Sequence, residues 1–386
     1  METAAPAPAP VTPRPQRHRA WWLVASAVAL VGVLALGAAG LTVWRISATR
    51  TPATAAAPVT VPEPLAGLPD RLQPPANPTA LPSGRAVGRG ALLYRIDNPD
   101  DFDAATGSFA PQPMYLVTAS GEQFGVGLAA RVGELSQALS PDGRWFAHRR
   151  DGQWWIRDLT GTAELAVPVG YELRLWSTDG RAVLLGQRSG SGEAYAAFSL
   201  PGGQLRTLAL RGMGNRRHVA FLDGRELATT EFTNAPNPRP YRQLTVAIQD
   251  VDGRTARSVS VATTQEVGPG DLRNAPVPLV RGGGDPPTMW AMVVGTEVPA
   301  GKPAGTEPPV TLVGVDLRSG RPVGRLELAV PQDRESEEFL GLAGTAILLQ
   351  SHTTNGSQLV AADPATGQRR VLTTLPDPAR VFIPGE

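Results

Sequence analysis

The sequence predicts an all-β fold, and three observations lead to this prediction. From about residue 87 onward, short apolar runs alternate with Gly, Asp-Gly and Pro, a pattern typical of strands and turns. No stretch of this region keeps a 3.6-residue apolar period for three turns, so helices are not expected there. Turns that contain glycine also recur at a regular spacing, which predicts a repeated four-stranded unit.

The repeat consists of two families of turns. One family ends an apolar run about every 40–50 residues, with a single interval of 67, at Gly121, Gly161, Gly203, Gly253, Gly320 and Gly367. The other precedes three of these turns, as "SPDGR" (140–144), "STDGR" (177–181) and "FLDGR" (221–225). Alternating turns at this period are typical of propeller blades. We therefore predict a six-bladed β-propeller over residues 87–386, or a seven-bladed one. Its last segment, "ARVFIPGE", could pair with an N-terminal strand to close the ring.

Residues 21–44 predict one transmembrane helix. The stretch "WWLVASAVALVGVLALGAAGLTVW" carries no charge, and at about 1.5 Å per residue it spans about 36 Å, enough to cross a hydrocarbon core. Trp residues at both of its ends suit the headgroup region. A cleaved signal peptide is the alternative, with Ala53-Thr54-Ala55 as its cleavage site, although its apolar region would be shorter.

The flanks of this span predict its orientation. Three arginines precede it within residues 1–20 and two follow it within residues 45–50. We therefore expect a disordered tail (1–20) on the cytoplasmic side of the cell membrane and a C-terminal domain on the extracytoplasmic side. Residues 45–86 are rich in Pro and predict an extracytoplasmic linker. The leucines in the second half of this linker either pack on the folded domain or stay free of it.

One blade is better preserved than the others. "LSPDGRWFAHRRDGQWWIRDLTG" (139–161) resembles the inner half of a blade in WD-repeat-like and TolB-like β-propellers, where an SPDG turn precedes one strand and a D-x-x-TG turn follows a later one. Arg157-Asp158 stands in place of the Trp-Asp pair, and no Gly-His pair starts the blades. The overall likeness is to membrane-anchored propeller proteins of actinobacteria. It implies an architecture and no particular activity.

The sequence predicts no catalytic residue, no cofactor site and no metal site. The absence of Cys excludes disulfides, thiol catalysis and thiolate metal sites. His148, His218 and His352 fall in different predicted blades and are expected to be ordinary strand or loop residues. Asp100, Asp101 and Asp103 offer oxygen ligands for calcium, but a solvated loop is the favoured interpretation.

Three further motifs have a structural interpretation that we favour. Gly125-x-Gly127-x-x-Ala130 matches a dinucleotide-binding pattern, but it lies in no βαβ unit and is expected at a blade edge. "RSGSGE" from Arg188 is expected to be a hairpin tip, since no G-x-S-x-G motif occurs. Trp154 and Trp155 should point to opposite faces of one strand, and we favour packing between blades over a platform for a ligand.

Charge and composition narrow the function. Residues 51–386 include 31 basic and 34 acidic residues. Because this part of the chain has no basic excess, nucleic acid is not an expected partner. We predict a single-pass membrane protein whose propeller is a non-catalytic module of the cell envelope, binding or scaffolding a protein or glycan without a cofactor. The alternative is a hydrolase or lyase of envelope polymers with carboxylates in the propeller channel. A third possibility is a sensor for a neighbouring signalling protein.

The segments "RGGGDPP" (281–287) and "GTEVPAGKPAGTEPPV" (295–310) break the repeat and are expected to form long loops, which often bind ligands.

Overall fold

The chain divides into two compact units, residues 1–57 and 58–386, and the computed structural model describes residues of the second. The described ranges are 59–96, 102–103, 108–109, 112–129, 138–189, 192–210, 217–231, 243–263, 281–283, 287–294, 310–329, 336–354 and 356–385. The predicted tail, the predicted transmembrane helix (21–44) and the start of the predicted linker lie outside them. In these ranges, no helix has the length and apolar character needed to cross a membrane.

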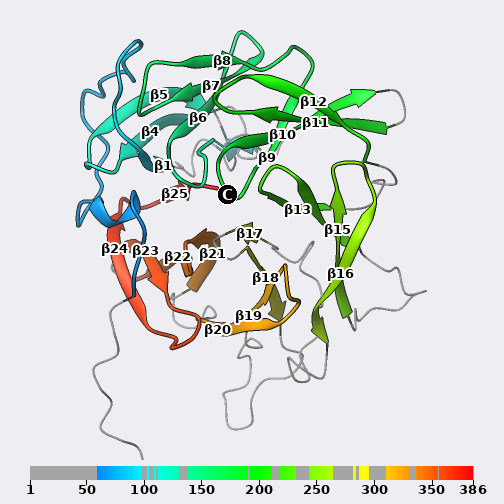
Figure 1. Cartoon of the computed structure of the whole chain (residues 1–386). Helices are drawn as coiled ribbons and strands as arrows, with labels where there is room; N and C mark the ends of the chain where they lie inside the picture. The colour runs from blue at the N-terminus through cyan, green and yellow to red at the C-terminus, as the bar shows by residue number, and fades with distance from the viewer. Residues whose placement is uncertain are drawn as a thin grey trace, which may run out of the picture. The chain divides into compact units, whose positions relative to one another are not determined.

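The described strands form six antiparallel sheets that follow one another along the chain, and we call them blades 1–6 (Figure 1). This arrangement is the six-bladed β-propeller that the sequence predicts, rather than a seven-bladed one. A 3-10 helix, η1 (Leu65–Gly67), precedes the first blade. A short hairpin of β2 (Phe102–Asp103) and β3 (Ser108–Phe109) follows β1.

The strands of the first three blades have the following bounds. Blade 1 contains β25 (Ala379–Phe382), β1 (Gly90–Ile96), β4 (Gln112–Thr118) and β5 (Gln123–Ala129), in that spatial order. Blade 2 contains β6 (Trp145–Arg150), β7 (Gln153–Asp158) and β8 (Glu164–Ala166). Blade 3 contains β9 (Glu172–Trp176), β10 (Ala182–Ser189), β11 (Gly192–Ser199) and β12 (Gln204–Leu208). Blade 2 also gains a short inner segment, because residue Leu139 bridges Phe146 of β6.

The other three blades each have four strands. Blade 4 contains β13 (Arg217–Leu222), β14 (Glu226–Glu231), β15 (Gln243–Asp250) and β16 (Thr255–Thr263). Blade 5 contains β17 (Arg281–Gly283), β18 (Thr288–Val294), β19 (Val310–Asp316) and β20 (Pro322–Leu328). Blade 6 contains β21 (Ser336–Ala343), β22 (Ala346–Thr353), β23 (Gly356–Ala362) and β24 (Arg369–Leu375). Residues 281–283 were expected in a loop, but they pair with β18 as the first strand of blade 5.

The C-terminal strand closes the ring. β25 pairs with β1 over four residue pairs, from Leu93 opposite Phe382 to Ile96 opposite Ala379, and Figure 1 shows the two strands side by side. The last strand of the chain thus becomes the innermost strand of the first blade. Pairing of "ARVFIPGE" with an N-terminal strand, left open by the sequence, is therefore confirmed.

The core consists of six apolar clusters, one at each boundary between neighbouring blades. Blades 1 and 2 meet around Leu93 and Phe146, and blades 2 and 3 meet around Trp154 and Phe198. Further clusters join blades 3 and 4, 4 and 5, and 5 and 6. The sixth joins blade 6 to blade 1 and completes the ring. Both faces of each sheet are thus apolar, which accounts for strands that read as short continuous apolar runs.

The two predicted turn families lie on one face of the propeller, which we call the turn face. Because strands alternate in direction within a blade, the first-to-second and third-to-fourth connections come out on the same side. Residues 140–144, 177–181 and 223–225 are connections of the first kind, and the six repeated glycines lie in connections of the second kind. Five of these glycines have φ between 63° and 83°, Gly161 being the exception. The hairpins between second and third strands lie on the opposite face.

The N-terminal part of the second unit runs along the propeller. We call residues 59–88 the strap. Its residues 59–86 lie within the range predicted as linker (45–86), and the compact unit begins at Pro58, ahead of the boundary at 87 expected from the sequence. Val59, Val61, Leu65 and Leu72 of the strap are all less than 9% exposed.

Candidate functional site

The turn at 140–144 is a rigid structure held by one serine and one aspartate. Ser140 Oγ donates to Asp142 Oδ1 at 2.6 Å and accepts from the backbone N–H of Trp145 at 2.8 Å. Asp142 Oδ1 also accepts from the N–H of Arg144, and Gly143 has φ +68°. The short polar side chains thus satisfy the backbone donors of the turn, which explains the Ser-x-Asp-Gly pattern.

The next blade repeats this geometry. Ser177 Oγ donates to Asp179 Oδ1 at 2.7 Å, and the N–H groups of Ala182 and Arg181 donate to Ser177 Oγ and Asp179 Oδ1. The third predicted copy, at 221–225, differs, because Phe221 stands in the serine position and supplies no hydroxyl. There Asp223 itself has φ +49°. The sequence pattern therefore grouped two different turns.

The turns of blades 2 and 3 line part of a hollow on the turn face. Its lining includes Asp142 of blade 2, Asp179 of blade 3 and Gly344 of blade 6, together with Glu63 of the strap and Arg89. Its volume is about 270 Å³. Residues from blades 2, 3 and 6 and from the strap thus converge on one small cavity.

Carboxylates dominate the charge of this hollow. Glu63, Asp142 and Asp179 face it along with the single guanidinium of Arg89, within the part of the chain that the structure describes. An ideal Cβ on Gly180 would lie 3.1 Å from Asp142 Oδ1, so the two aspartate-bearing turns adjoin. Oδ1 of each aspartate accepts hydrogen bonds within its own turn.

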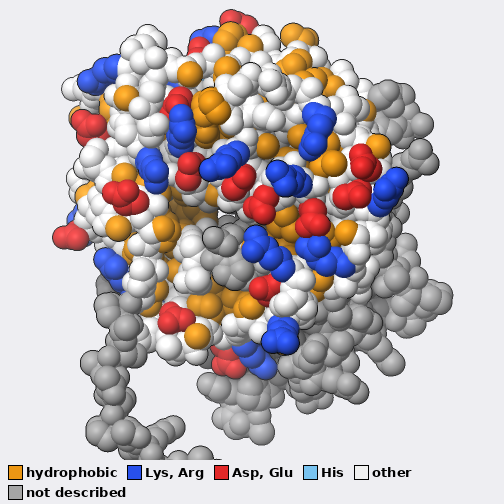
Figure 2. Space-filling view, in the orientation of Figure 1, with side chains coloured by type: hydrophobic (Ala, Val, Ile, Leu, Met, Phe, Trp, Pro, Cys, Tyr) orange, Lys and Arg blue, Asp and Glu red, His pale blue; other side chains and the backbone are white. Residues whose placement is uncertain are grey.

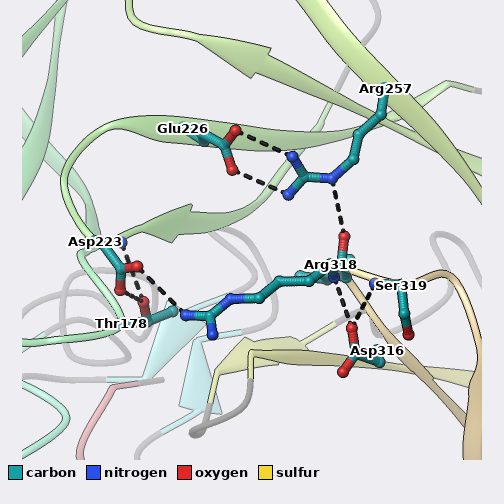
Figure 3. A network of polar contacts seen from close by, with 8 residues as sticks. Thr178, Asp223, Glu226, Arg257, Asp316, Arg318 and Ser319 are labelled. Atoms are coloured by element: carbon teal, nitrogen blue, oxygen red, sulfur yellow. Dashed lines mark hydrogen bonds and ion pairs between the residues drawn. The ribbon is translucent and has the colours of Figure 1, made fainter.

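A chain of polar contacts continues from the hollow across blades 3, 4 and 5 (Figure 3). Thr178 Oγ1 donates to Asp223 Oδ1 at 3.2 Å, and Arg318 Nη2 lies 3.5 Å from Asp223 Oδ2. Asp316 Oδ1 accepts from the N–H groups of Arg318 and Ser319 at 2.7 Å. Since the Asp223 and Arg318 side chains are more than half exposed, their ion pair adds little stability.

A second pair in Figure 3 is more strongly held. Arg257 of blade 4 donates two hydrogen bonds to the carboxylate of Glu226, at 3.1 and 3.0 Å. Its Nε also donates to the carbonyl of Leu317 in blade 5 at 3.3 Å. This guanidinium therefore ties two blades together. In the view of Figure 2, acidic and basic side chains are interspersed around the middle of the molecule.

The histidines do not converge. His148 lies on β6, His218 on β13 and His352 on β22, in blades 2, 4 and 6. Within the described ranges, no group of three His, Asp or Glu side chains could hold a metal ion. Asp100 and Asp101 lie outside those ranges, and Asp103 ends β2.

One serine and histidine pair was not foreseen from the sequence. Ser357 Oγ lies 2.9 Å from His352 Nδ1, across neighbouring strands of blade 6. A serine nucleophile needs a base at this distance, but it must also be reached by its substrate. Ser357 is 1% exposed, so this pair is a structural hydrogen bond.

The glycine motif, the "RSGSGE" segment and Trp154 have the structural roles that the sequence favoured, whereas Trp155 is not part of the cluster between the blades. Gly125 and Gly127 lie on β5, the outer strand of blade 1, and "RSGSGE" spans the tip of the β10–β11 hairpin, where Ser189 pairs with Gly192. Trp154 is 4% exposed in the cluster between blades 2 and 3. Trp155 is half-buried, with the guanidinium of Arg150 3.9 Å from its ring centre.

His148 should make stability depend on pH. Burial lowers its pKa, opposed by the hydrogen bond and charge of Glu164 and reinforced by Arg150 and Arg157. The unfolded chain therefore binds the proton more strongly than the folded one. The contribution of His148 to the free energy of unfolding is fully present above the unfolded pKa of about 6.5, and it is lost as pH falls through the lower folded pKa. We expect His148→Gln, which keeps a partner for Glu164, to flatten this loss in urea titrations between pH 7 and 5. An unchanged slope would contradict the assignment.

The pKa of Asp158 is lowered as well, although by different causes. Burial raises its pKa, but hydrogen bonds from Arg144 and Thr160 outweigh burial and lower it. The Arg144 Nη2 to Asp158 Oδ2 distance is 2.7 Å. This pair joins the two turn families within blade 2.

Comparison with known proteins gives likenesses of fold only. No family model and no curated protein matches the chain. Among solved structures, it is similar to TolB from Acinetobacter baumannii, with 14% identity over 72% of this chain and 62% of that one, and a TM-score of 0.42. It is also similar to the β-propeller domain of the Trilobed protease from Pyrococcus furiosus (11% identity, 79% and 98% coverage, TM-score 0.40) and to an oligogalacturonate lyase in complex with manganese (12%, 77% and 85%, 0.39). The six-bladed architecture itself rests on the strand pairing and the blade interfaces described above.

Sequence reasoning missed the contribution of the strap to the hollow. Glu63 and Leu65 lie in a Pro-rich stretch that reads as a spacer. The available signal was the set of apolar residues in that stretch, Val59, Val61 and Leu65, which a free linker has no reason to carry.

Proposed function

We propose that this protein is a membrane-anchored, extracytoplasmic binding module that holds part of a cell-envelope protein or glycan at the hollow of its turn face, without catalysis. The observation that carries this proposal is the convergence of three blades and the strap on one hollow. Its volume of about 270 Å³ lies just below the usual range for sites that enclose a whole small molecule. Such a hollow suits a single side chain, sugar ring or loop tip that projects from a larger partner.

The charge around the hollow supports a polar partner. Three carboxylates and one guanidinium line it, so a donor-rich group of a peptide or glycan would find acceptors there. The external location rests on the sequence of residues 21–44 and its flanking charges. A module held at the membrane by one span would meet envelope components at high effective concentration.

Site-specific photo-crosslinking tests this proposal. Arg89 lines the hollow and has an exposed side chain, whereas Val169, which is 81% exposed, lies in the connection from blade 2 to blade 3, on the opposite face. A photoreactive residue at position 89 of the full-length chain should give a discrete adduct with an envelope protein or glycan in cells. The same residue at position 169 should not. Equal labelling at both positions, or none at position 89, would contradict the proposal.

A second candidate function is favoured by the adjoining carboxylates of Asp142 and Asp179. A hydrolase or lyase of envelope polymers would use such a pair as acid and base. Asp142→Asn and Asp179→Asn keep the oxygen that accepts the Ser hydrogen bond, so both turns should persist. Release of soluble fragments from purified envelope polymers by the wild-type protein, abolished in both variants, would favour catalysis over binding.

A further inference from the structure

The strap is tied to three consecutive blades around the ring closure. It first meets blade 6, where the N–H of Leu72 donates to the carbonyl of Thr374 and the N–H of Thr374 donates to the carbonyl of Asp70, both at 2.9 Å. It then passes the outer strand of blade 1, where the N–H of Leu81 donates to the carbonyl of Gly125 at 3.1 Å. The strap therefore pairs with outer strands of blades 6 and 1 as an added extended segment.

The end of the strap is held by blade 2. The N–H of Val87 donates to the carbonyl of Leu159 at 2.8 Å. Arg157, which is 8% exposed, donates to the carbonyls of Pro82 and Arg85. Arg157 stands in the position of the Trp of the Trp-Asp pair. The residue that departs from the repeat is therefore one that binds the strap. A guanidinium suits this task, since it can donate to several carbonyls at once.

The apolar side chains of the strap belong to one particular blade interface. Val59, Val61, Leu65 and Leu72 all pack in the cluster between blades 6 and 1. This is the boundary where the first and last strands of the propeller meet. At its 3-10 helix the strap approaches blade 1 so closely that an ideal Cβ on Gly67 would lie 2.0 Å from the carbonyl oxygen of Ala119.

The ring closure itself is a short element. β25 contributes four residue pairs to β1. Gln350 Nε2 of blade 6 donates to the carbonyl of Ala379 at 2.7 Å, and the N–H of Gly385, just after β25, donates to the carbonyl of Leu139 at 2.9 Å. β25 is four residues long, within the ordinary range for a strand, and Ala379 and Val381 pack in the same cluster as the apolar side chains of the strap. The strap adds backbone pairing and buried apolar surface at the same boundary.

We propose that the strap is a releasable clasp that keeps the ring closed at blade 1 and controls the hollow on the turn face. When it is docked, residues 62–65 form one wall of the hollow. When it is released, that wall is removed and the boundary between blades 6 and 1 loses the four apolar side chains that cover it. A pull on the N-terminal end of the strap, or a partner that binds it, would thereby open the hollow. This proposal holds whichever ligand the hollow binds.

Hydrogen exchange on the full-length chain tests this proposal. Gly67→Ala should push the strap away from Ala119 without backbone strain, since Gly67 does not have positive φ. We expect the amides of Leu72 and Leu81 to exchange at least tenfold faster, and the amides of β25 to accelerate with them. Gly202→Ala is the matched control, because its Cβ would meet nothing closer than 3.9 Å, and it should leave both sets unchanged. Faster exchange in the strap without faster exchange in β25, or no change in the strap, would overturn the proposal.

A reversible lock provides the complementary variant. Arg71 and Thr374 are bridge partners on parallel segments, at a separation that a disulfide can span, and the natural chain has no Cys. In the Gly67→Ala background, Arg71→Cys with Thr374→Cys should restore slow exchange in β25 when oxidised and lose it again on reduction. Amide exchange rates in β25 that are the same in the oxidised and the reduced protein would contradict the proposal.

Discussion

Gly143→Ala should lower the free energy of unfolding by about 3–5 kcal/mol. Gly143 has φ +68°, and an ideal Cβ there would lie 2.1 Å from the carbonyl oxygen of Gly90 and 3.0 Å from Pro64 Cγ. The N–H of Gly90 also donates to the carbonyl of Gly143 at 2.7 Å. The substitution therefore strains the turn, separates blade 2 from blade 1 and disturbs the strap. Urea unfolding followed by tryptophan fluorescence measures the loss.

Gly152→Ala is the matched control for Gly143→Ala. Gly152 has φ +76° in the hairpin of the same blade, and its Cβ would meet nothing within 4 Å. Gly152→Ala should therefore lower the free energy of unfolding only by the strain of a non-glycine residue at positive φ, about 1–2 kcal/mol. The difference between the two variants isolates the contact between blades. Equal losses would show that the close approach of Gly143 to Gly90 contributes nothing.

Trp154→Ala should lower the free energy of unfolding by about 3–5 kcal/mol. The indole is buried between blades 2 and 3, and its Nε1 donates to Glu172 Oε2 at 2.9 Å. The guanidinium of Arg149 lies 5.6 Å from the ring centre and also pairs with Glu172 at 3.0 Å. Removing the ring leaves a cavity at the interface and a carboxylate with one fewer donor.

The neighbouring tryptophan supplies the comparison. Trp155 is half-buried and covered on one side by Arg150, so Trp155→Ala should cost about 1 kcal/mol. Trp154→Phe should lose only about 1–2 kcal/mol, because it keeps most of the apolar volume and removes the N–H. A Trp155→Ala loss as large as that of Trp154→Ala would contradict the assignment of the two faces of β7.

The turns and strands were predictable because their causes are local. Asp-Gly and Ser-x-Asp-Gly segments satisfy their own backbone donors within a few residues, as Ser140 and Asp142 do. The strands "RWFAHRR" and "QWWIRDL" accordingly appear as β6 and β7. Their pairing, Trp145 with Asp158 through Arg150 with Gln153, follows from the Asp151-Gly152 turn.

The docking of the strap and its share in the hollow were left open by the sequence, because the contacts that fix them join residues distant in sequence. Val59 accepts a hydrogen bond from Arg370, 311 residues away, and no local pattern specifies that contact. The closure by β25 was left open for the same reason. The candidate site combines both kinds of element. Its aspartates belong to local turns, while Glu63 and Leu65 reach it only through the docked strap.

Amide exchange with and without an envelope preparation tests the central claim most directly, that the turn face of this propeller is a binding surface. The N–H groups of Arg144 and Arg181 lie in the two aspartate turns at the hollow, and the Asp151-Gly152 hairpin on the opposite face is the internal control. In a detergent-solubilised envelope fraction, we expect the full-length chain to exchange more slowly at 141–144 and 177–181 and at an unchanged rate at 149–154. Protection confined to the opposite face, or no protection on the turn face, would contradict the account.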